Sequence, residues 1–231
     1  MDILCEGFET LCKNDSDSAS LLSPRKEEII SLLNQYIKEI ELFNPAYGLV
    51  GTDNTNDLII RHILDSLAPL GIILRLLKNQ SALKCIFDNC ENPRTKIADA
   101  GSGAGLPGIP LAIAMPHCDF SLVERMGRRA GFLLNTKAAL SLTNITIEES
   151  EIEKIPQDQF DLVTFRAFKP IEPKLLKTLL KVCKPDGVIA AYKGKMEKIR
   201  EEMEQLTVKW EAIPYNVPFL DEERNILVIR L

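Results

Sequence analysis

From residue 95 onward, short apolar runs alternate with segments of helical periodicity, and this alternation limits the fold more than any other feature. The runs that we expect to form strands are 96–99, 119–124, 145–147, 160–165, 187–193, 208–215 and 225–230. Strands that alternate with helices form a parallel sheet with helices on both faces. The last two runs favour an antiparallel end to that sheet. We therefore predict an α/β protein with a mostly parallel, seven-stranded sheet.

The N-terminal part of the chain is predicted to be helical. Residues 1–22 show no sustained pattern, so we expect a short helix or a mobile tail there. The segment 23–45 begins with Ser-Pro, a helix-start signal, and continues with apolar residues at helical spacing. A second helix is expected at 59–67. These patterns suggest an N-terminal helical cap, 1–70, followed by the α/β domain, 71–231, in one continuous structural unit.

Charge, cysteine content and hydropathy exclude several classes of protein. The net charge is −5, but residues 1–60 hold 11 acidic and 4 basic side chains, so the later part can carry local basic patches. The six cysteines form no Cys-x-x-Cys pair and the two histidines are 55 residues apart, so we expect no metal site. We expect a cytoplasmic protein, because the chain begins with no signal-peptide pattern and no apolar run approaches the roughly 20 residues of a membrane helix.

The strongest local signal is the glycine-rich turn Asp99–Gly108, which follows a predicted strand and opens a helix. Glycines allow a backbone to approach a ligand closely, and the N–H groups at a helix start point toward it. A P-loop would require Lys-Ser or Lys-Thr after the last glycine, but Ile109 follows. A dinucleotide fingerprint fits poorly, because Gly103 lies four residues beyond the strand and Pro107 interrupts the segment that would pack against pyrophosphate.

The remaining interpretation is a turn that binds S-adenosylmethionine, with an acid at the strand end before Gly-x-Gly-x-Gly. Asp99 could accept from the ammonium group of the ligand's amino-acid part, directly or through water. Glu124 ends the next strand 25 residues later, and a carboxylate there can bind both hydroxyls of a ribose. Either acid alone could be a solvated strand end, but the pair in register favours a ribose-containing ligand.

Several segments, in order along most of the chain, resemble one protein family. They are Arg61-His-Ile-Leu-Asp-Ser66, Gly101-Ser-Gly-Ala-Gly-Leu-Pro-Gly-Ile-Pro110, Arg166-Ala-Phe168, Tyr192-Lys-Gly194 and Val217-Pro-Phe-Leu-Asp-Glu-Glu-Arg224. The chain resembles the bacterial small-subunit ribosomal RNA methyltransferase G family, also called the glucose-inhibited division protein B family. The resemblance implies a Rossmann-like class I methyltransferase fold that transfers a methyl group from S-adenosylmethionine to N7 of one guanine in 16S ribosomal RNA.

The resemblance and the turn together give a set of expected cofactor-binding residues. These are Asp99, Gly101, Ser102, Gly103, Gly105, Leu106, Glu124, Ile152, Glu153 and Arg166. Two positions depart from the family's usual pattern. Tyr47-Gly-Leu-Val50 stands where the family usually has Tyr-Asn-Leu-Thr, and Glu151 stands where it usually has a basic residue.

Basic side chains near the predicted strand ends form a candidate RNA-binding rim. They are Arg125, Arg128, Arg129, Arg166, Lys169, Lys193 and Lys195. Each alone could be a solvated charge, but as a group beside the cofactor they could bind phosphates. We expect small-subunit ribosomal RNA, naked or within a ribosomal particle, to be the partner of a monomer that binds no membrane and no metal.

The later half of the chain contains no obvious acid–base machinery. The segment 164–168 lacks the Asn/Asp-Pro-Pro-aromatic clamp that holds an exocyclic amine, and Cys183 is expected to be a structural thiol rather than a nucleophile. Guanine N7 has a free lone pair and no proton, so its methylation requires orientation but no general base. Arg166 is predicted to orient the guanine or a phosphate, and its alternative role is a salt bridge that steadies the loop.

Two other functions stay open at this stage. The same scaffold could methylate another RNA or a small molecule, because a fold does not fix its substrate. A non-catalytic regulator that binds S-adenosylmethionine or RNA is the other alternative.

Overall fold

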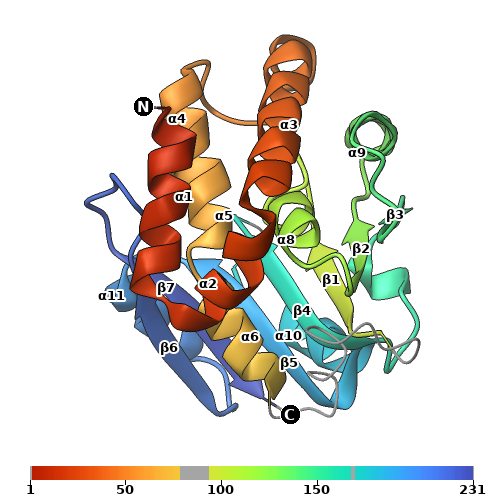
Figure 1. Ribbon diagram of the computed structural model, residues 1–231. Helices are drawn as coiled ribbons and strands as arrows, with labels where there is room; N and C mark the ends of the chain where they lie inside the picture. Colours follow the sequence, from red (N-terminus) through yellow and green to blue (C-terminus); the bar gives the residue numbers. More distant parts are fainter. Residues whose placement is uncertain (1, 79–93, 168–169, 231) are drawn as a thin grey trace.

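A seven-stranded sheet forms the centre of the protein in the computed structural model, which describes residues 2–78, 94–167 and 170–230 (Figure 1). The strands are β1 (Lys96–Ala100), β2 (Asp119–Val123), β3 (Ile145–Glu148), β4 (Phe160–Arg166), β5 (Cys183–Lys193), β6 (Trp210–Tyr215) and β7 (Arg224–Arg230). Their order is β3-β2-β1-β4-β5-β7-β6. Neighbouring strands from β3 to β5 are parallel, whereas β7 is antiparallel to both β5 and β6. The predicted sheet is therefore confirmed.

Helices cover both faces of the sheet and bury a separate apolar cluster against each face. The helices after β1 are α8 (Gly108–Ala114), α9 (Gly127–Ala139), α10 (Pro173–Val182) and α11 (Met196–Met203), with a short 3-10 turn η4 (Ile152–Lys154) after β3. Helices α8 and α9 share one cluster with the N-terminal helices, while α10 and α11 pack on the other face (Figure 1). The sheet thus has a helical layer on each side, as its parallel connections require.

The N-terminal helices form a layer against the sheet. They are α1 (Ile3–Asn14), α2 (Ser16–Leu22), η1 (Ser23–Arg25), α3 (Lys26–Tyr47), α4 (Thr55–Leu58), the π-helical segment η2 (Ile59–Leu64), α5 (Asp65–Leu67) and α6 (Leu70–Lys78). Of the two expectations for 1–22, a short helix or a mobile tail, the helix is confirmed and the tail is wrong. This segment forms two helices whose Leu4, Phe8 and Leu22 are fully buried in the core.

Two predicted element boundaries also need correction. Helix α3 does not end near Asn44 but continues to Tyr47, because Gly48 adopts a left-handed conformation (φ +58°) and donates its N–H to the Asn44 carbonyl. Strand β5 begins at Cys183 instead of residue 187, because Cys183 already pairs with Phe160 across an irregularity in the ladder. Neither change alters the sheet order.

The fold brings the strand ends and the N-terminal helices together at one edge of the sheet. The carboxyl ends of β1, β2, β4 and β5 meet there, which is where ligands bind in open α/β sheets. The buried Tyr36 of α3 donates its hydroxyl to the Ala104 carbonyl at 2.7 Å, within the glycine-rich turn. The helical layer therefore supports the turn directly. In the described part of the chain, no helix has both the length and the apolar character needed to cross a membrane.

Candidate active site

The glycine-rich turn after β1 has a backbone conformation that strongly favours glycine. Gly101, Gly103 and Gly105 all have positive φ angles, of +70°, +59° and +92°. At Gly105 a Cβ atom would also lie 2.4 Å from the Ile109 side chain, which is far inside van der Waals contact. The turn ends at Gly108, the first residue of α8. The pattern of glycines seen in the sequence therefore reflects one specific loop conformation.

Asp99 lies beneath this turn and is completely buried. Its Oδ2 accepts from the Ser102 hydroxyl at 2.7 Å and from the Gly108 N–H at 3.0 Å. Its Oδ1 is buried without a hydrogen-bond partner among the described residues. Burial raises the pKa of Asp99 to about 6, although both hydrogen bonds favour the ionised form. One carboxylate oxygen thus holds the turn together and the other is left unsatisfied.

Glu124 follows β2 and binds the same turn through one carboxylate oxygen. Oε2 accepts from the Gly103 N–H at 3.0 Å, and Oε1 accepts from the Met126 N–H at 2.8 Å. The residue is only 4% exposed. Because each carboxylate oxygen has two lone pairs, these bonds leave acceptor capacity for a ligand hydroxyl. Glu124, the predicted ribose-binding acid, is therefore held in place by the glycine-rich turn with which it was predicted to form one site.

The other expected cofactor residues lie around this turn. Ser102 and Leu106 are buried within it, and Ile152 is buried in η4, which follows β3 at the same edge of the sheet. Glu153 is exposed beside Ile152. The structure brings these residues near the ends of β1, β2 and β3 but contains no ligand that would assign their contacts.

Arg166 ends β4 and is bound to the π-helical segment and the residues after it. Its Nη1 donates to the Arg61 carbonyl at 2.9 Å and to Asp65 Oδ2 at 3.1 Å, and its Nη2 lies 2.9 Å from His62 Nδ1. The salt bridge given as the alternative role of Arg166 is therefore present, to Asp65. Both terminal nitrogens of the Arg166 guanidinium thus already have partners in the protein. The predicted role of Arg166 in orienting the substrate stays a prediction.

Asp65 is the centre of a buried polar network that sequence reasoning left without a role. Besides Arg166, it accepts from the Tyr215 hydroxyl at 2.9 Å and lies 3.5 Å from Arg224 Nε. The side chain of Asp65 is 5% exposed, so these partners replace its hydration. The available signal was an acid inside the apolar run Ile63-Leu-Asp-Ser-Leu67, because a charge in such a run requires a buried partner.

The described residues of the basic rim predicted from the sequence divide into exposed side chains and side chains with partners in the protein. Arg125 and Lys195 are exposed beyond β2 and β5. Arg128 lies over the Tyr47 ring, 5.7 Å from its centroid, and Arg129 Nη2 approaches the Gly48 carbonyl at 3.4 Å. The departure from the family pattern at 47–50 thus lies directly against two rim arginines.

Lys193 belongs to the side chains with partners in the protein. Its Nζ contacts both carboxylate oxygens of Glu202, at 2.7 and 2.8 Å, and lies over the Phe165 ring. Lys169 and Phe168, which the sequence also singled out, lie outside the described residues.

Two other chemistries find little support here. Cys183 is 1% exposed, and burial raises the pKa of its thiol to about 12, so it is no ready nucleophile. Within the described ranges, no group of three or more His, Cys, Asp or Glu side chains could hold a metal ion.

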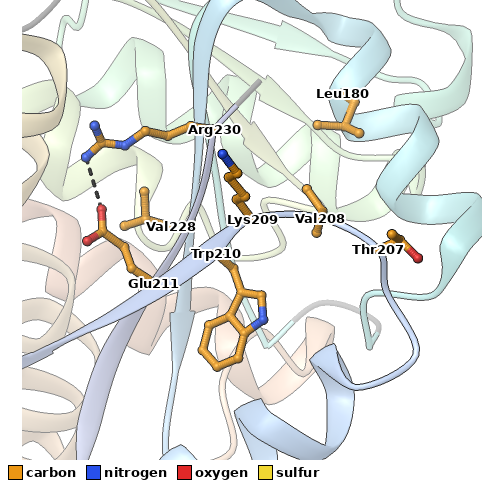
Figure 2. Close-up of a pocket in the computed structure, with 8 residues that line it drawn as sticks. All are labelled: Leu180, Thr207, Val208, Lys209, Trp210, Glu211, Val228 and Arg230. Carbon is orange, nitrogen blue, oxygen red and sulfur yellow. Dashed lines mark hydrogen bonds and ion pairs between the residues drawn. The ribbon is translucent and has the colours of Figure 1, made fainter.

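A separate hollow of about 610 Å³ lies around β6, the edge strand of the sheet that is farthest from β3 (Figure 2). Trp210, Val208 and Val228 give it an apolar lining, and Arg230 pairs with Glu211 at 3.0 Å. It contains neither the glycine turn nor a carboxylate at the end of a parallel strand. Volume alone therefore does not identify the functional site.

Solved structures support the fold. A SAM-dependent methyltransferase from Aquifex aeolicus superposes with a TM-score of 0.50 at 14% identity, over 69% of this chain and 98% of that chain. A predicted O-methyltransferase from Agrobacterium tumefaciens gives a TM-score of 0.50 at 16% identity, over 61% of this chain and 76% of that chain. At these identities the likeness shows the fold alone.

Sequence relatives are more specific. The chain is 42% identical to the ribosomal RNA small subunit methyltransferase G of Treponema denticola, over 87% of this chain and 86% of that protein. It is 33% identical to the protein of the same name from Polynucleobacter asymbioticus, over 90% and 88% of the two chains. The family model described as rRNA small subunit methyltransferase G matches residues 29–227. The resemblance seen in the sequence is confirmed, and the chain belongs to the rRNA small subunit methyltransferase G family.

Proposed function

We propose that this protein transfers a methyl group from S-adenosylmethionine to N7 of one guanine in small-subunit ribosomal RNA. Family membership makes it an S-adenosylmethionine-dependent methyltransferase of 16S ribosomal RNA. The observation that supports the choice of N7 is that no described residue lining the cavity at the ends of β4 and β5 is suited to act as a general base.

The turn fits the cofactor on its own chemistry. The Oδ1 of Asp99 is a buried acceptor without a donor among the described residues, as expected for a group that receives a ligand ammonium directly or through water. Glu124 retains lone pairs for ribose hydroxyls, and we propose that Ile152 and Glu153, in the turn after β3, border the adenine. When bound, S-adenosylmethionine supplies an electrophilic methyl group on a sulfonium sulfur.

The neighbouring cavity offers no good general base among its described lining residues. Burial, together with the charges of Arg166 and Arg61, lowers the pKa of His62 to about 4. Asp65 is already held by Tyr215 and two arginines. Burial raises the pKa of Tyr192 far above its ordinary value of 10. An acceptor that must lose a proton would need such a base, whereas N7 attacks through a lone pair and loses none.

The basic rim supports RNA as the substrate. Exposed Arg125, Arg128 and Lys195 border the cofactor turn and the cavity, where they can bind phosphates on either side of the target nucleotide. The complete site comes from a single chain, so we propose a monomer. Methyl transfer to a neutral lone pair needs no Lewis acid, so we propose that no metal takes part. The substrate is ribosomal RNA, either naked or within a ribosomal particle, and we propose that the reaction occurs in the cytoplasm, where that RNA is found.

The test is to incubate the protein with S-adenosylmethionine and small-subunit ribosomal RNA from a strain that lacks the enzyme. N7-methylguanosine makes the chain cleavable by aniline after reduction, so the product can be mapped to one nucleotide. We expect a single cleavage. Methylation on carbon or on an exocyclic amine, which resists this cleavage, would contradict the proposal.

Arg166→Lys tests the role of the arginine in the same assay. Lysine cannot reproduce the planar fork that joins Asp65 and His62. We expect the variant to bind S-adenosylmethionine but to lose most methyl transfer. The matched control is Lys181→Met, at an exposed position on α10, which should retain full activity. Wild-type turnover by Arg166→Lys would leave Arg166 with a structural salt bridge only.

A further inference from the structure

The cavity at the ends of β4 and β5 has the size and position of a substrate pocket. Its volume is about 460 Å³, within the usual range of roughly 300–1,000 Å³ for ligand sites. Strands β1 and β4 are adjacent, with Asp99 in register with Thr164. Arg166, on the cavity wall two residues later, therefore lies level with the start of the glycine-rich turn. A base in this cavity would lie beside the cofactor site.

Most hydrogen-bond donors on the cavity wall already have acceptors within the protein. The Tyr192 hydroxyl donates to the Ser66 carbonyl at 2.7 Å, and the Tyr215 hydroxyl donates to Asp65 at 2.9 Å. Lys193 is paired with Glu202. These groups line the cavity, but their donors are already used in bonds within the protein.

His62 differs, because its bond to Arg166 fixes which ring nitrogen carries the proton. Arg166 Nη2 lies 2.9 Å from His62 Nδ1. A guanidinium can only donate, so Nδ1 must be the acceptor and the proton of the neutral ring must be on Nε2. Burial and the nearby positive charges lower the pKa of His62 to about 4, so the ring stays neutral at physiological pH. Nε2–H is therefore an obligate donor, and no described residue accepts from it.

We propose that the Nε2–H of His62 donates to the O6 carbonyl of the target guanine and so selects guanine over adenine, an inference that rests on the proposed function. Guanine presents O6 and N7 as adjacent acceptors, whereas adenine places an amino group where O6 would be. A fixed donor attracts the first arrangement and repels the second. A bond to O6 also leaves the N7 lone pair free to attack the methyl group. Arg166 acts as a positioning residue, because it sets the tautomer of His62.

The experiment varies the base and the histidine separately. The RNA carries guanine, inosine or 2-aminopurine at the nucleotide that the wild type methylates. Inosine keeps O6 and N7 and loses only the 2-amino group, while 2-aminopurine keeps N7 and lacks O6. For the wild type we expect kcat/KM on 2-aminopurine to fall about ten- to hundredfold, the effect of leaving one buried donor unpaired, with a smaller change on inosine.

The variants separate the two ring nitrogens. His62→Asn keeps an acceptor near the position of Nδ1 and removes the Nε2 donor, whereas His62→Gln places an amide nitrogen near Nε2. We expect His62→Asn to lose about ten- to hundredfold on guanine RNA and little more on 2-aminopurine RNA, because the same bond is already missing. His62→Gln should recover part of the discrimination. His117→Asn, which changes the other histidine at the opposite edge of the sheet, should behave as wild type.

The outcomes distinguish this inference from the proposed function. If the wild type does not methylate N7 of a guanine in ribosomal RNA, the proposed function fails whatever the variants do. If it does, but uses 2-aminopurine and guanine equally well, the role of His62 is refuted. The same follows if His62→Asn binds S-adenosylmethionine and still distinguishes 2-aminopurine from guanine as strongly as the wild type. Should His62→Asn fail to fold, the wild-type comparison of the three bases decides alone.

Discussion

Replacing Asp99 by asparagine should separate the stability of the protein from its affinity for S-adenosylmethionine. The side chain is fully buried, and burial raises its pKa from 3.8 to about 6. The folded protein therefore binds a proton at Asp99 more readily than the unfolded chain does. The stability that this group contributes is fully present below about pH 4 and is lost as the pH rises through about 6. Asparagine has nearly the same shape but does not ionise, so its stability does not carry this pH dependence.

The magnitude follows from the pKa. A difference of about two units corresponds to about 3 kcal/mol in the free energy of unfolding. Asparagine also places an amide N–H where Oδ1 has no partner, and an unsatisfied buried donor costs about 1–3 kcal/mol at every pH. We therefore expect Asp99→Asn to be less stable than the wild type at pH 4. Between pH 4 and pH 8 it should gain about 3 kcal/mol relative to the wild type.

Urea unfolding at pH values from 4 to 8 measures this difference, with Asp221→Asn as a control at an exposed carboxylate. With saturating S-adenosylmethionine at pH 8 the wild type should become more stable than Asp99→Asn, because only the ionised carboxylate pairs with the ligand ammonium. Parallel stability profiles for Asp99→Asn and the wild type would refute the reasoning about burial. Equal cofactor affinity for the two proteins would refute the assignment of Oδ1 to the ligand.

Three further substitutions test other parts of the structure. Glu124→Gln should weaken S-adenosylmethionine binding by about 1.5–3 kcal/mol in calorimetry, because a charged acceptor for the ribose is lost while the side-chain shape is kept. Phe8→Ala should lower the free energy of unfolding by about 3–5 kcal/mol, since this side chain is fully buried in the core; a change below 1 kcal/mol would mean that α1 is not part of the folded unit. Cys183→Ala should retain methyl transfer in a turnover assay, because the thiol is buried and its pKa is raised to about 12.

The sequence predicted the sheet and the cofactor turn because both depend on local patterns. Alternating apolar runs and helical periodicity define the strands of a parallel sheet without knowledge of distant contacts. The turn is defined by a strand, an acid and glycines within ten residues, and the structure shows why: Gly105 has a positive φ and no room for a Cβ. Asp99 and Glu124 could be paired in advance, because adjacent parallel strands end at the same edge.

The polar network beneath the cavity could not be predicted from local patterns. Asp65 meets Arg166 and Tyr215 across 101 and 150 residues of sequence, and no spacing rule links such positions. The packing of residues 1–22 against the core could not be predicted for a similar reason. Ser and Asp residues in this segment weaken the helical pattern, but Asp15 accepts from the Ser18 N–H as an N-cap and joins Asp17 in binding Arg75 of α6. Tertiary contacts thus stabilise helices that local sequence patterns do not predict.

These contacts also bear on the division into a helical cap and a catalytic domain. The cavity wall combines His62 and Asp65 from the N-terminal layer with Arg166 from β4, and Tyr36 of α3 supports the glycine-rich turn proposed to bind the cofactor. Neither layer contains a complete site. We therefore propose that the N-terminal layer and the sheet fold as one unit, in which the helices fix the guanidinium of Arg166 and, through it, the tautomer of His62. On this view the helical layer takes part in choosing the base, and the sheet provides the cofactor turn beside it.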